Sequence, residues 1–510
     1  MKRALVASAI LMVAGAGLAR GQVRQRTLAE DLQLFSQVLN QIRVNHPDSV
    51  EAHTLLIAAI NGMVNAADPH SFVIPAVRFD GARYDAWLNG KLQPVAVDFS
   101  WMDGAAIVSS VTPGSKASRL DIMPGDELIE IDGKPLVADS PTELEITLAG
   151  NAGSSVPVVF ERRRADGTIV QLPRTLPRER VGEQSAIPAS LMLDATTGYI
   201  KINTFMGGKV SDDLHSAVES LGKRGMQRLV LDLRDNGGGR IDMAAGVAGE
   251  FLPKNALVFT TWGPKKETID TVRVQRSFWE SQKRYPLVVL VNAGTASASE
   301  IVAGALQDHD RATIVGQTSF GKALIMSGLP LSDGSMIELV VGHVSTPCGR
   351  VVQRTYKGFS HRYYLRTAGV AADTIGRPTC KTDAGRTVYG GGGIVPDVIL
   401  PKRTTPEWAS MLGESDAYVI WANGWAAAHA AQLTSADDFA KTALPADALA
   451  DFRKFAEGKG VAIPADADAR LNGILMRAVA FTKWGEDGAY RVRVVSDPEI
   501  KAALSAFKPQ

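Results

Sequence analysis

Strand-like and helix-like segments alternate along residues 185–345, and this alternation restricts the fold more than any other feature of the chain. Each of three short apolar runs is followed by a stretch with helical spacing: 198–202 by 211–221, 228–233 by 244–251, and 287–291 by 298–307. Two more strand-like runs follow, at 313–315 and 336–341. Strands that alternate with helices form βαβ units, so the sequence predicts an α/β core with parallel strands.

The regions on either side of this core have different patterns. Residues 27–66 show helical spacing, whereas 95–177 hold short β-type runs separated by Gly, Pro and Asp turns. From residue 403 onward Ala, Leu and Trp dominate, and helices are expected at 438–449 and 467–481. The predicted fold is a multidomain α/β chain with these parts: N-terminal helices at 22–90, a β-rich domain at 91–180, the core at 181–402 and a helical region at 403–510.

The first 21 residues have the layout of a secretory signal peptide. Lys2 and Arg3 precede an uncharged run at 4–19 that is rich in Ala, Leu and Val, and small residues follow. The alternative is a membrane anchor, but this run is shorter than the roughly 20 residues that span a bilayer. We therefore expect an exported protein, periplasmic or secreted, with a signal peptide at 1–21.

The charge balance and the two cysteines limit which binding partners and cofactors are expected. The 55 basic and 54 acidic residues give a net charge of +1, which offers no electrostatic footprint for nucleic acid or an anionic membrane. Cys348 and Cys380 are candidates for a disulfide in an oxidising compartment, the alternative being two unrelated thiols. They lack the neighbouring ligands of a zinc site, and the sequence indicates no metal and no other cofactor.

A serine stands where a buried strand is expected to meet a helix. Residues 292–300 read Asn-Ala-Gly-Thr-Ala-Ser-Ala-Ser-Glu. Ser297 and Glu300 have the spacing of a capping box, so the serine could simply cap the helix. A serine at a helix N-terminus also lies in a positive field beside unpaired N–H groups, which can stabilise an oxyanion. The pattern alone leaves a helix cap and a nucleophile open.

Two more loops end strands of the same predicted sheet. Three glycines at 237–239 expose backbone N–H groups, as an anion or oxyanion site requires. Lys322 ends the loop 316–322, which formally matches the first seven positions of a phosphate-binding P-loop. Nucleotide binding is a remote alternative, because Ala323 stands where Ser or Thr would hold magnesium. A buried lysine can instead lose its proton and act as general base to a serine.

Together, these motifs resemble the carboxyl-terminal processing, or tail-specific, serine protease family, over nearly the whole mature chain. Asp-Pro-His-Ser at 68–71 is similar to the family's N-terminal signature, and 113–117 with 122–126 are similar to its PDZ domain. Residues 232–239 match its glycine motif, 296–300 its nucleophile motif and 320–322 its base motif. The resemblance implies a serine-type peptidase core of βαβ type, with a PDZ-like domain inserted at 91–180.

The resemblance also implies roles for individual residues. Ser297 and Lys322, 25 positions apart as in the family, would be nucleophile and general base of a Ser–Lys dyad. Asp308 would be a supporting acid, and the N–H groups of Gly238 and Ala298 would bind the oxyanion. Substrates would be proteins or peptides with free, apolar C-terminal tails. If the PDZ-like domain binds them, they would add as a strand along Val95, Ala96, Val97, Asp98 and Phe99.

Two departures from the family pattern keep a second hypothesis open. Met326 stands where the family has a Gln that helps to hold the lysine, and a Met side chain cannot donate a hydrogen bond. Lys-Leu-Gln-Pro at 91–94 stands where a Gly-rich carboxylate-binding loop is expected. The chain could therefore be a PDZ-bearing scaffold on a weak or inactive protease fold. An adaptor protein and a homo-oligomer also stay open as partners.

Overall fold

The chain consists of two compact units, residues 1–67 and 68–510. The computed structural model describes residues 26–507, apart from 49, 75–80, 103–104, 112–114, 118–119, 121, 123–125, 139–140, 164–168, 180–185, 207–208, 266, 276–284, 333–334, 358–363, 365–373, 403–405 and 415–416. The predicted signal peptide at 1–21 and parts of the PDZ-like motif, 113–114 and 123–125, lie outside the described residues.

The first unit contains two helices, α2 (Leu28–Asn45) and α3 (Ala52–Ala67). Thr27 and Glu30 form a capping box that starts α2. The Thr27 N–H donates to the Glu30 carboxylate at 2.7 Å, and the Glu30 N–H donates to the Thr27 hydroxyl at 3.3 Å. The helices that the sequence predicts at 27–66 are therefore present.

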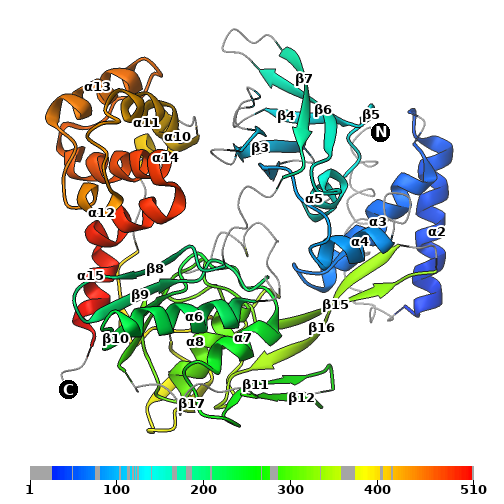
Figure 1. Ribbon diagram of the computed structural model, residues 1–510. Coiled ribbons are helices and arrows are strands. Elements are labelled where there is room, and N and C mark those ends of the chain that lie inside the picture. The colour runs from blue at the N-terminus through cyan, green and yellow to red at the C-terminus, as the bar shows by residue number, and fades with distance from the viewer. Residues whose placement is uncertain are drawn as a thin grey trace, which may run out of the picture. The chain divides into compact units, whose positions relative to one another are not determined.

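An antiparallel sheet and a helix form the β-rich part predicted at 91–180 (Figure 1). The strand order is β2-β3-β4-β6-β7, with β5 paired to β4. The elements are β2 (Val97–Met102), β3 (Ala105–Val111), β4 (Glu127–Ile131), β5 (Lys134–Pro135), α5 (Pro141–Leu148), β6 (Ser155–Arg163) and β7 (Ile169–Pro177). This sheet has its own apolar core, in which Val108, Leu128 and Phe160 are buried.

Six strands form the central sheet of the α/β core, in the order β19-β14-β13-β10-β9-β8. All neighbouring strands are parallel except β8 and β9. The strands are β8 (Ala189–Met192), β9 (Thr197–Lys201), β10 (Arg228–Asp232), β13 (Leu287–Val291), β14 (Thr313–Gly316) and β19 (Val398–Ile399). The prediction of an α/β core with parallel strands is confirmed.

Helices cover both faces of the central sheet, because successive strand residues point to opposite faces. Leu231 and Val289 pack on one face, which is covered by α6 (Val210–Lys223), α7 (Ile241–Ala248) and α8 (Ala298–Asp308). Val230 and Val288 pack on the other face with the end of α14 (Asp468–Ser496) and with α15 (Pro498–Ser505). The last helices of the chain are therefore part of the core.

A second sheet is antiparallel and has the order β1-β16-β11-β12, with β15 paired to β16. Its strands are β1 (Phe72–Ile74), β11 (Leu257–Trp262), β12 (Thr268–Arg273), β15 (Leu324–Pro330) and β16 (Met336–Ser345). β1, followed by α4 (Gly81–Leu88), falls within the region 22–90 that was expected to be helical. A strand of three residues is too short to show a sequence period, and its partner β16 lies far along the chain.

The C-terminal region is helical, as predicted. It contains α10 (Glu407–Glu414), α11 (Ala417–Ala428), α12 (Ala436–Phe439), α13 (Ala446–Glu457), α14 and α15. The single helix predicted at 438–449 is wrong, because α12 ends at Phe439 and α13 begins only after Pro445. Proline lacks the N–H that a continuous helix would need at this position.

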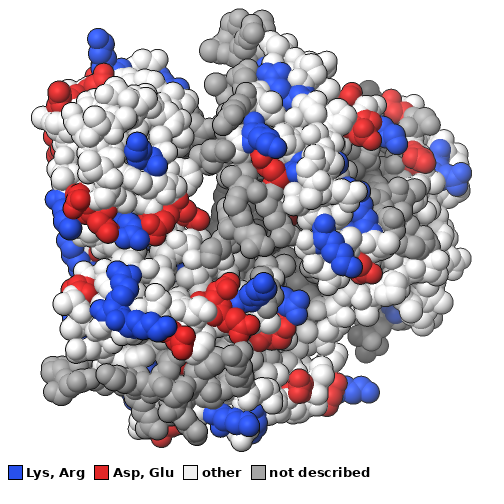
Figure 2. Space-filling model, in the orientation of Figure 1, with Lys and Arg blue, Asp and Glu red and all other residues white. Residues whose placement is uncertain are grey.

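Both signs of charge are interspersed on the face of the molecule drawn in Figure 2. This distribution agrees with the nearly equal numbers of basic and acidic residues in the sequence. Among the described residues, no helix combines the length and the hydropathy needed to cross a bilayer.

Candidate active site

Three loops meet at the carboxyl ends of the neighbouring strands β10, β13 and β14. Parallel pairing in register keeps these strand ends level. The loops that follow the three strands carry Gly238, Ser297 and Lys322, respectively. Open α/β sheets usually carry their sites at this edge, so the fold brings the three predicted motifs together.

Ser297 occupies the turn between β13 and α8 in a strained backbone conformation. Its φ is 55° and its ψ is −117°, which residues with a side chain rarely adopt outside functional sites. It directly precedes α8, whose N-terminus carries the positive end of the helix dipole. The turn is held on the glycine-loop side by the Ala296 N–H, which donates to the Asn236 carbonyl at 3.0 Å.

Glu300, in the first turn of α8, joins the serine turn to the lysine loop. Glu300 is 1% exposed, and its carboxylate accepts four hydrogen bonds. Oε2 accepts the N–H groups of Ser297 at 3.0 Å and Lys322 at 2.8 Å. Oε1 accepts the Ser319 hydroxyl at 2.5 Å and the Gly321 N–H at 2.7 Å. One carboxylate therefore fixes the two backbones relative to each other.

Burial raises the pKa of Glu300 to about 7, and the donors around the carboxylate oppose this rise. The sequence indicated Glu300 only as a capping partner of Ser297. Its link to the lysine loop was missed because the donors there lie 19 to 22 positions further along the chain.

Lys322 and Ser297 line the same small cavity, together with Glu300 and apolar side chains such as Phe259. Burial lowers the pKa of Lys322, and the negative charges of Glu300 and Asp68 partly oppose that shift. Within the part of the chain that the structure describes, no acidic side chain forms an ion pair with the Lys322 amine. The amine can therefore be neutral at a lower pH than an exposed lysine.

Gly238 packs directly against the serine turn. Its φ is 99°, and a Cβ atom there would lie 2.6 Å from the Ala296 carbonyl oxygen and 2.8 Å from the Ser297 Cβ. The Gly238 N–H donates to the side-chain oxygen of Asn236 at 2.9 Å. The Ala298 N–H is the first of α8, so it has no acceptor within its own helix. Of the two expected oxyanion donors, the Gly238 N–H is thus already bonded to Asn236, whereas the Ala298 N–H has no acceptor within α8.

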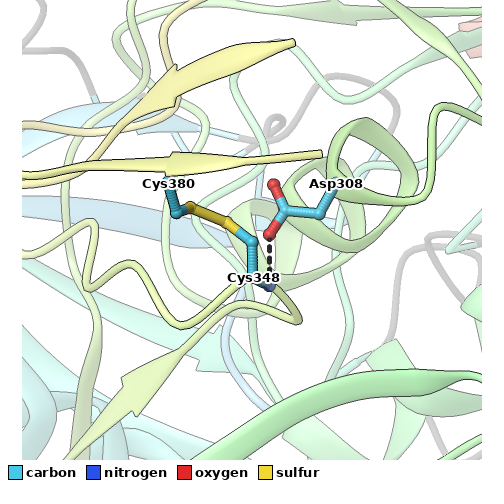
Figure 3. Close-up of side chains that lie close together, drawn as sticks. All are labelled: Asp308, Cys348 and Cys380. Carbon is cyan, nitrogen blue, oxygen red and sulfur yellow. Dashed lines mark hydrogen bonds between the residues drawn. A yellow bond between two sulfur atoms is a disulfide. The ribbon is translucent and has the colours of Figure 1, made fainter. Parts of the chain in front are cut away.

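Asp308 lies at the end of α8 that is opposite to Ser297, roughly 15 Å along the helix axis. Its carboxylate is buried and pairs with Arg350 at 2.7 Å, and the Cys348 N–H donates to its other oxygen at 3.1 Å. Cys348 is joined to Cys380 by a disulfide (Figure 3). Asp308 therefore holds the far end of the helix and does not reach Ser297.

Asp308, Cys348 and Cys380 also form the one close group of metal-binding side-chain types among the described residues. The two sulfur atoms are bonded to each other, and only a thiolate is a good metal ligand. The group is accounted for by the disulfide and the Asp308–Arg350 pair.

The residues expected to receive a peptide lie at an edge of the β-rich sheet. Val97, Asp98 and Phe99 form the first half of β2, which pairs with β3 and ends the strand order. Val95 and Ala96 precede it and are buried. An edge strand can accept an added strand on its open side.

The adjoining loop, 91–94, differs from a carboxylate-binding loop. The N–H groups of Lys91 and Leu92 donate to the Ala86 carbonyl at 2.7 and 3.3 Å, and that of Gln93 donates to Gly150 at 2.7 Å. Pro94 has no N–H. All four residues are described, and none offers a free backbone donor to a substrate carboxylate.

Gln353 supports the lysine loop from another part of the chain. Its side-chain oxygen accepts the Ala323 N–H at 2.9 Å, and its amide donates to the Tyr364 hydroxyl at 3.1 Å. Met326, which replaces the family's Gln, lies in β15 opposite Val340. No local signal in the sequence marks Gln353, because its contact depends on the path of the chain after β16.

The loop 316–322 does not have the structure of a phosphate-binding loop. The strand β15 follows it, where a P-loop requires a helix. The N–H groups of Gly321 and Lys322 donate to the Glu300 carboxylate, so they cannot cradle a phosphate. The loop therefore gives no support to the remote alternative of a P-loop NTPase.

Both the α/β core and the β-rich domain match known protein families. Residues 196–360 match the model of Peptidase family S41, and residues 107–162 match that of the PDZ domain. A carboxy-terminal-processing protease of Bartonella bacilliformis is 29% identical over 329 residues, which cover 64% of this chain and 73% of that protein. The chain therefore contains a peptidase domain of family S41 and a PDZ domain, and its relatives are named carboxy-terminal processing proteases. It is a serine-type peptidase with a PDZ domain.

Other relatives show how far the similarity extends. The carboxyl-terminal-processing protease of Synechocystis sp. is 36% identical over 242 residues, or 46% of this chain and 53% of that protein. Among solved structures, a photosystem II D1 C-terminal processing protease is 26% identical. That comparison covers 74% of this chain and 89% of the other, with a TM-score of 0.42.

Replacing Gly238 by Ala should inactivate the peptidase. The new Cβ would collide with the serine turn, and the positive φ disfavours any side chain. Alanine keeps the backbone N–H but would shift it. If this N–H binds the oxyanion, its displacement should lower kcat for peptide cleavage about 100- to 1000-fold. Gly237→Ala is the matched control, because a Cβ at Gly237 meets nothing within 4 Å. Full activity of Gly238→Ala would contradict the assignment of this loop to the site.

Replacing Glu300 by Gln should both destabilise the protein and slow cleavage. The amide nitrogen of Gln cannot accept hydrogen bonds, so donors that now bind a carboxylate oxygen would lose their acceptor. Each buried donor left without an acceptor lowers the free energy of unfolding by about 1–3 kcal/mol. Urea unfolding measures the stability, and peptide hydrolysis measures the activity of the folded fraction. Glu219→Gln, at an exposed position on α6, should change neither quantity. Unchanged hydrolysis by Glu300→Gln would show that the shared carboxylate is dispensable.

Proposed function

We propose that this chain is an exported endopeptidase that cuts proteins or peptides near apolar C-terminal tails with a Ser297–Lys322 dyad. The observation that carries the proposal is the cavity that both side chains line. The serine stands at the N-terminus of α8, and burial lowers the pKa of the lysine. The proposed nucleophile and the proposed base therefore line the same cavity.

The reaction would begin when the neutral Lys322 amine takes the proton of the Ser297 hydroxyl. The serine oxygen attacks the peptide carbonyl, and the N–H groups of Ala298 and Gly238 stabilise the oxyanion. Collapse of this intermediate expels the amine of the C-terminal fragment, which receives the proton from the Lys322 ammonium. Water, activated by the same amine, then hydrolyses the acyl-enzyme.

Gly238 would have to exchange one acceptor for another during this reaction. Its N–H is held by the neutral amide oxygen of Asn236 at 2.9 Å. Hydrogen bonds to a charged acceptor are about twice as strong as those to a neutral one, so a developing oxyanion can compete for the donor. The oxyanion site would thus be completed by the substrate.

Asp308 would act as a positioning residue for the far end of α8. It is buried against Arg350 and Cys348 and anchors the helix that carries Ser297. Its contribution would be to hold the helix, with no contact to the reacting atoms.

The PDZ-like domain would supply the peptide contact by strand addition along β2, at Val97 to Phe99. The backbone donors of loop 91–94 are already used, which favours recognition of an extended segment over capture of a terminal carboxylate. Export is supported by the Lys2–Arg3 run and the apolar stretch after it.

A scaffold with little activity is the second candidate. It is favoured by the contact between Gly238 and Asn236, which occupies one of the two expected oxyanion donors. Such a protein would bind peptide along β2 without cleaving it.

Incubation of the purified protein with a protein that ends in an apolar tail separates the two candidates. The wild type should release a C-terminal fragment, and Ser297→Ala and Lys322→Met should not, because nucleophile or base is missing. Ser216→Ala, at an exposed position of α6, serves as the matched control and should cleave normally. Equal fragment release by wild type and Ser297→Ala would rule out the dyad.

The pH dependence of kcat/KM should report the titration of Lys322. Because burial disfavours the ammonium form, the rate should rise with pH and level off clearly below pH 10.5, the ordinary lysine value. Lys322→Arg should stay inactive throughout, since a guanidinium does not lose its proton. Hydrolysis of a short peptide from pH 5 to 10 measures the profile. A rate still rising at pH 10 would contradict a lowered pKa.

A further inference from the structure

Glu499, in the first turn of α15, touches both of the loops that flank the serine. Its Oε2 accepts a hydrogen bond from the Arg234 guanidinium at 2.5 Å. Its Oε1 accepts one from the Gln317 side chain at 3.0 Å. Arg234 begins the glycine loop and Gln317 begins the lysine loop, so one carboxylate from the C-terminal segment spans two active-site loops.

Arg234 is a buried charge whose position is fixed on every side. Its side chain is 1% exposed and binds Asp232 through Nε and Nη2, at 3.0 and 2.6 Å. Its Nη1 donates to Asp497 at 2.9 Å as well as to Glu499. A buried guanidinium needs such partners, because an unpaired charge is strongly disfavoured inside a protein. The start of the glycine loop therefore depends on acids that arrive from the end of the chain.

Gln317 holds the lysine loop in a comparable way. Its N–H donates to the Val291 carbonyl at 3.1 Å, which ties it to the last residue of β13. Its side-chain amide donates to Glu499 at 3.0 Å and to the Pro401 carbonyl at 3.4 Å. The loop from Gln317 to Lys322 is thus anchored to α15 at one end and to Glu300 at the other.

The helix α15 is itself firmly placed. Asp497 caps it by accepting the Glu499 N–H at 2.9 Å, and Arg493 from α14 lies 3.6 Å from the same carboxylate. Ile500 and Ala503 are buried against the central sheet. Glu499 therefore presents its two oxygens from a rigid support.

We propose that Glu499 is a positioning residue for catalysis, which sets the glycine loop and the lysine loop at the correct separation through Arg234 and Gln317. The inference rests on the proposed peptidase function and adds a requirement to it: the C-terminal helix α15 must be docked for Ser297 to react efficiently. Glu499 is too deeply tied to its partners to touch substrate, so its effect appears in kcat and leaves KM unchanged.

A double-mutant cycle on the full-length protein tests this role. Glu499→Gln removes the charge and one of the two acceptor oxygens. Gln317→Ala removes the link between Glu499 and the lysine loop, together with the 3.4 Å contact of the same amide with the Pro401 carbonyl. Each should lower kcat for an apolar-tailed peptide at least 10-fold and change KM less than 2-fold. The double variant should be little slower than Glu499→Gln alone, because Gln317 acts through Glu499. Glu457→Gln, exposed at the end of α13, should behave as wild type.

Hydrogen exchange of the loops 236–239 and 317–322 supplies a readout that does not require cleavage. Glu499→Gln should speed exchange in both loops, Gln317→Ala in the second alone, and Glu457→Gln in neither. Unchanged exchange, independent effects of the two substitutions on kcat, or a loss of activity that only follows the unfolded fraction would overturn the inference. If the wild type cleaves no faster than Ser297→Ala, the proposed function fails, and the exchange data decide on Glu499 by themselves.

Discussion

The buried carboxylate of Glu300 is the contact on which the geometry of the site depends. Removing a carboxylate from water is costly unless donors replace the water, and here four donors do so. The N-terminus of α8 adds a field that favours negative charge at this position. Because two of the donors are the N–H groups of Ser297 and Lys322, the same interaction that satisfies the buried acid holds the serine turn and the lysine loop together.

Backbone constraints complete what the carboxylate begins. Ser297 adopts a positive φ that its side chain disfavours, and Gly238 adopts one that only glycine tolerates at such close approach. Such strain persists only where the surrounding contacts fix the chain. Here those contacts come from Asn236, which accepts the Ala296 N–H through its carbonyl and the Gly238 N–H through its side chain.

The C-terminal helix α15 contributes contacts to the edge of the sheet that carries the candidate active site. Asp497 and Glu499, at the start of this helix, pair with the buried Arg234 just before the glycine loop. Arg234 also pairs with Asp232, and this pair holds the pKa of the aspartate well below its usual range. At the other end of α8, the pair of Asp308 and Arg350 beside the disulfide plays a similar part. Two buried ion-pair clusters, around Arg234 and around Arg350, thus flank the apolar core.

The sequence by itself determined the α/β core and the three loops, because short apolar runs, helical spacing and glycine clusters are local patterns. Local motifs also carried the family resemblance that singled out Ser297, Lys322 and Gly238. Only the tertiary structure decided that Asp308 lies far from Ser297, that Gln353 supports the lysine loop, and that Glu499 reaches two loops at once. Those contacts join residues that lie far apart in the chain, and their partners are chosen by how the elements pack, which no local pattern records.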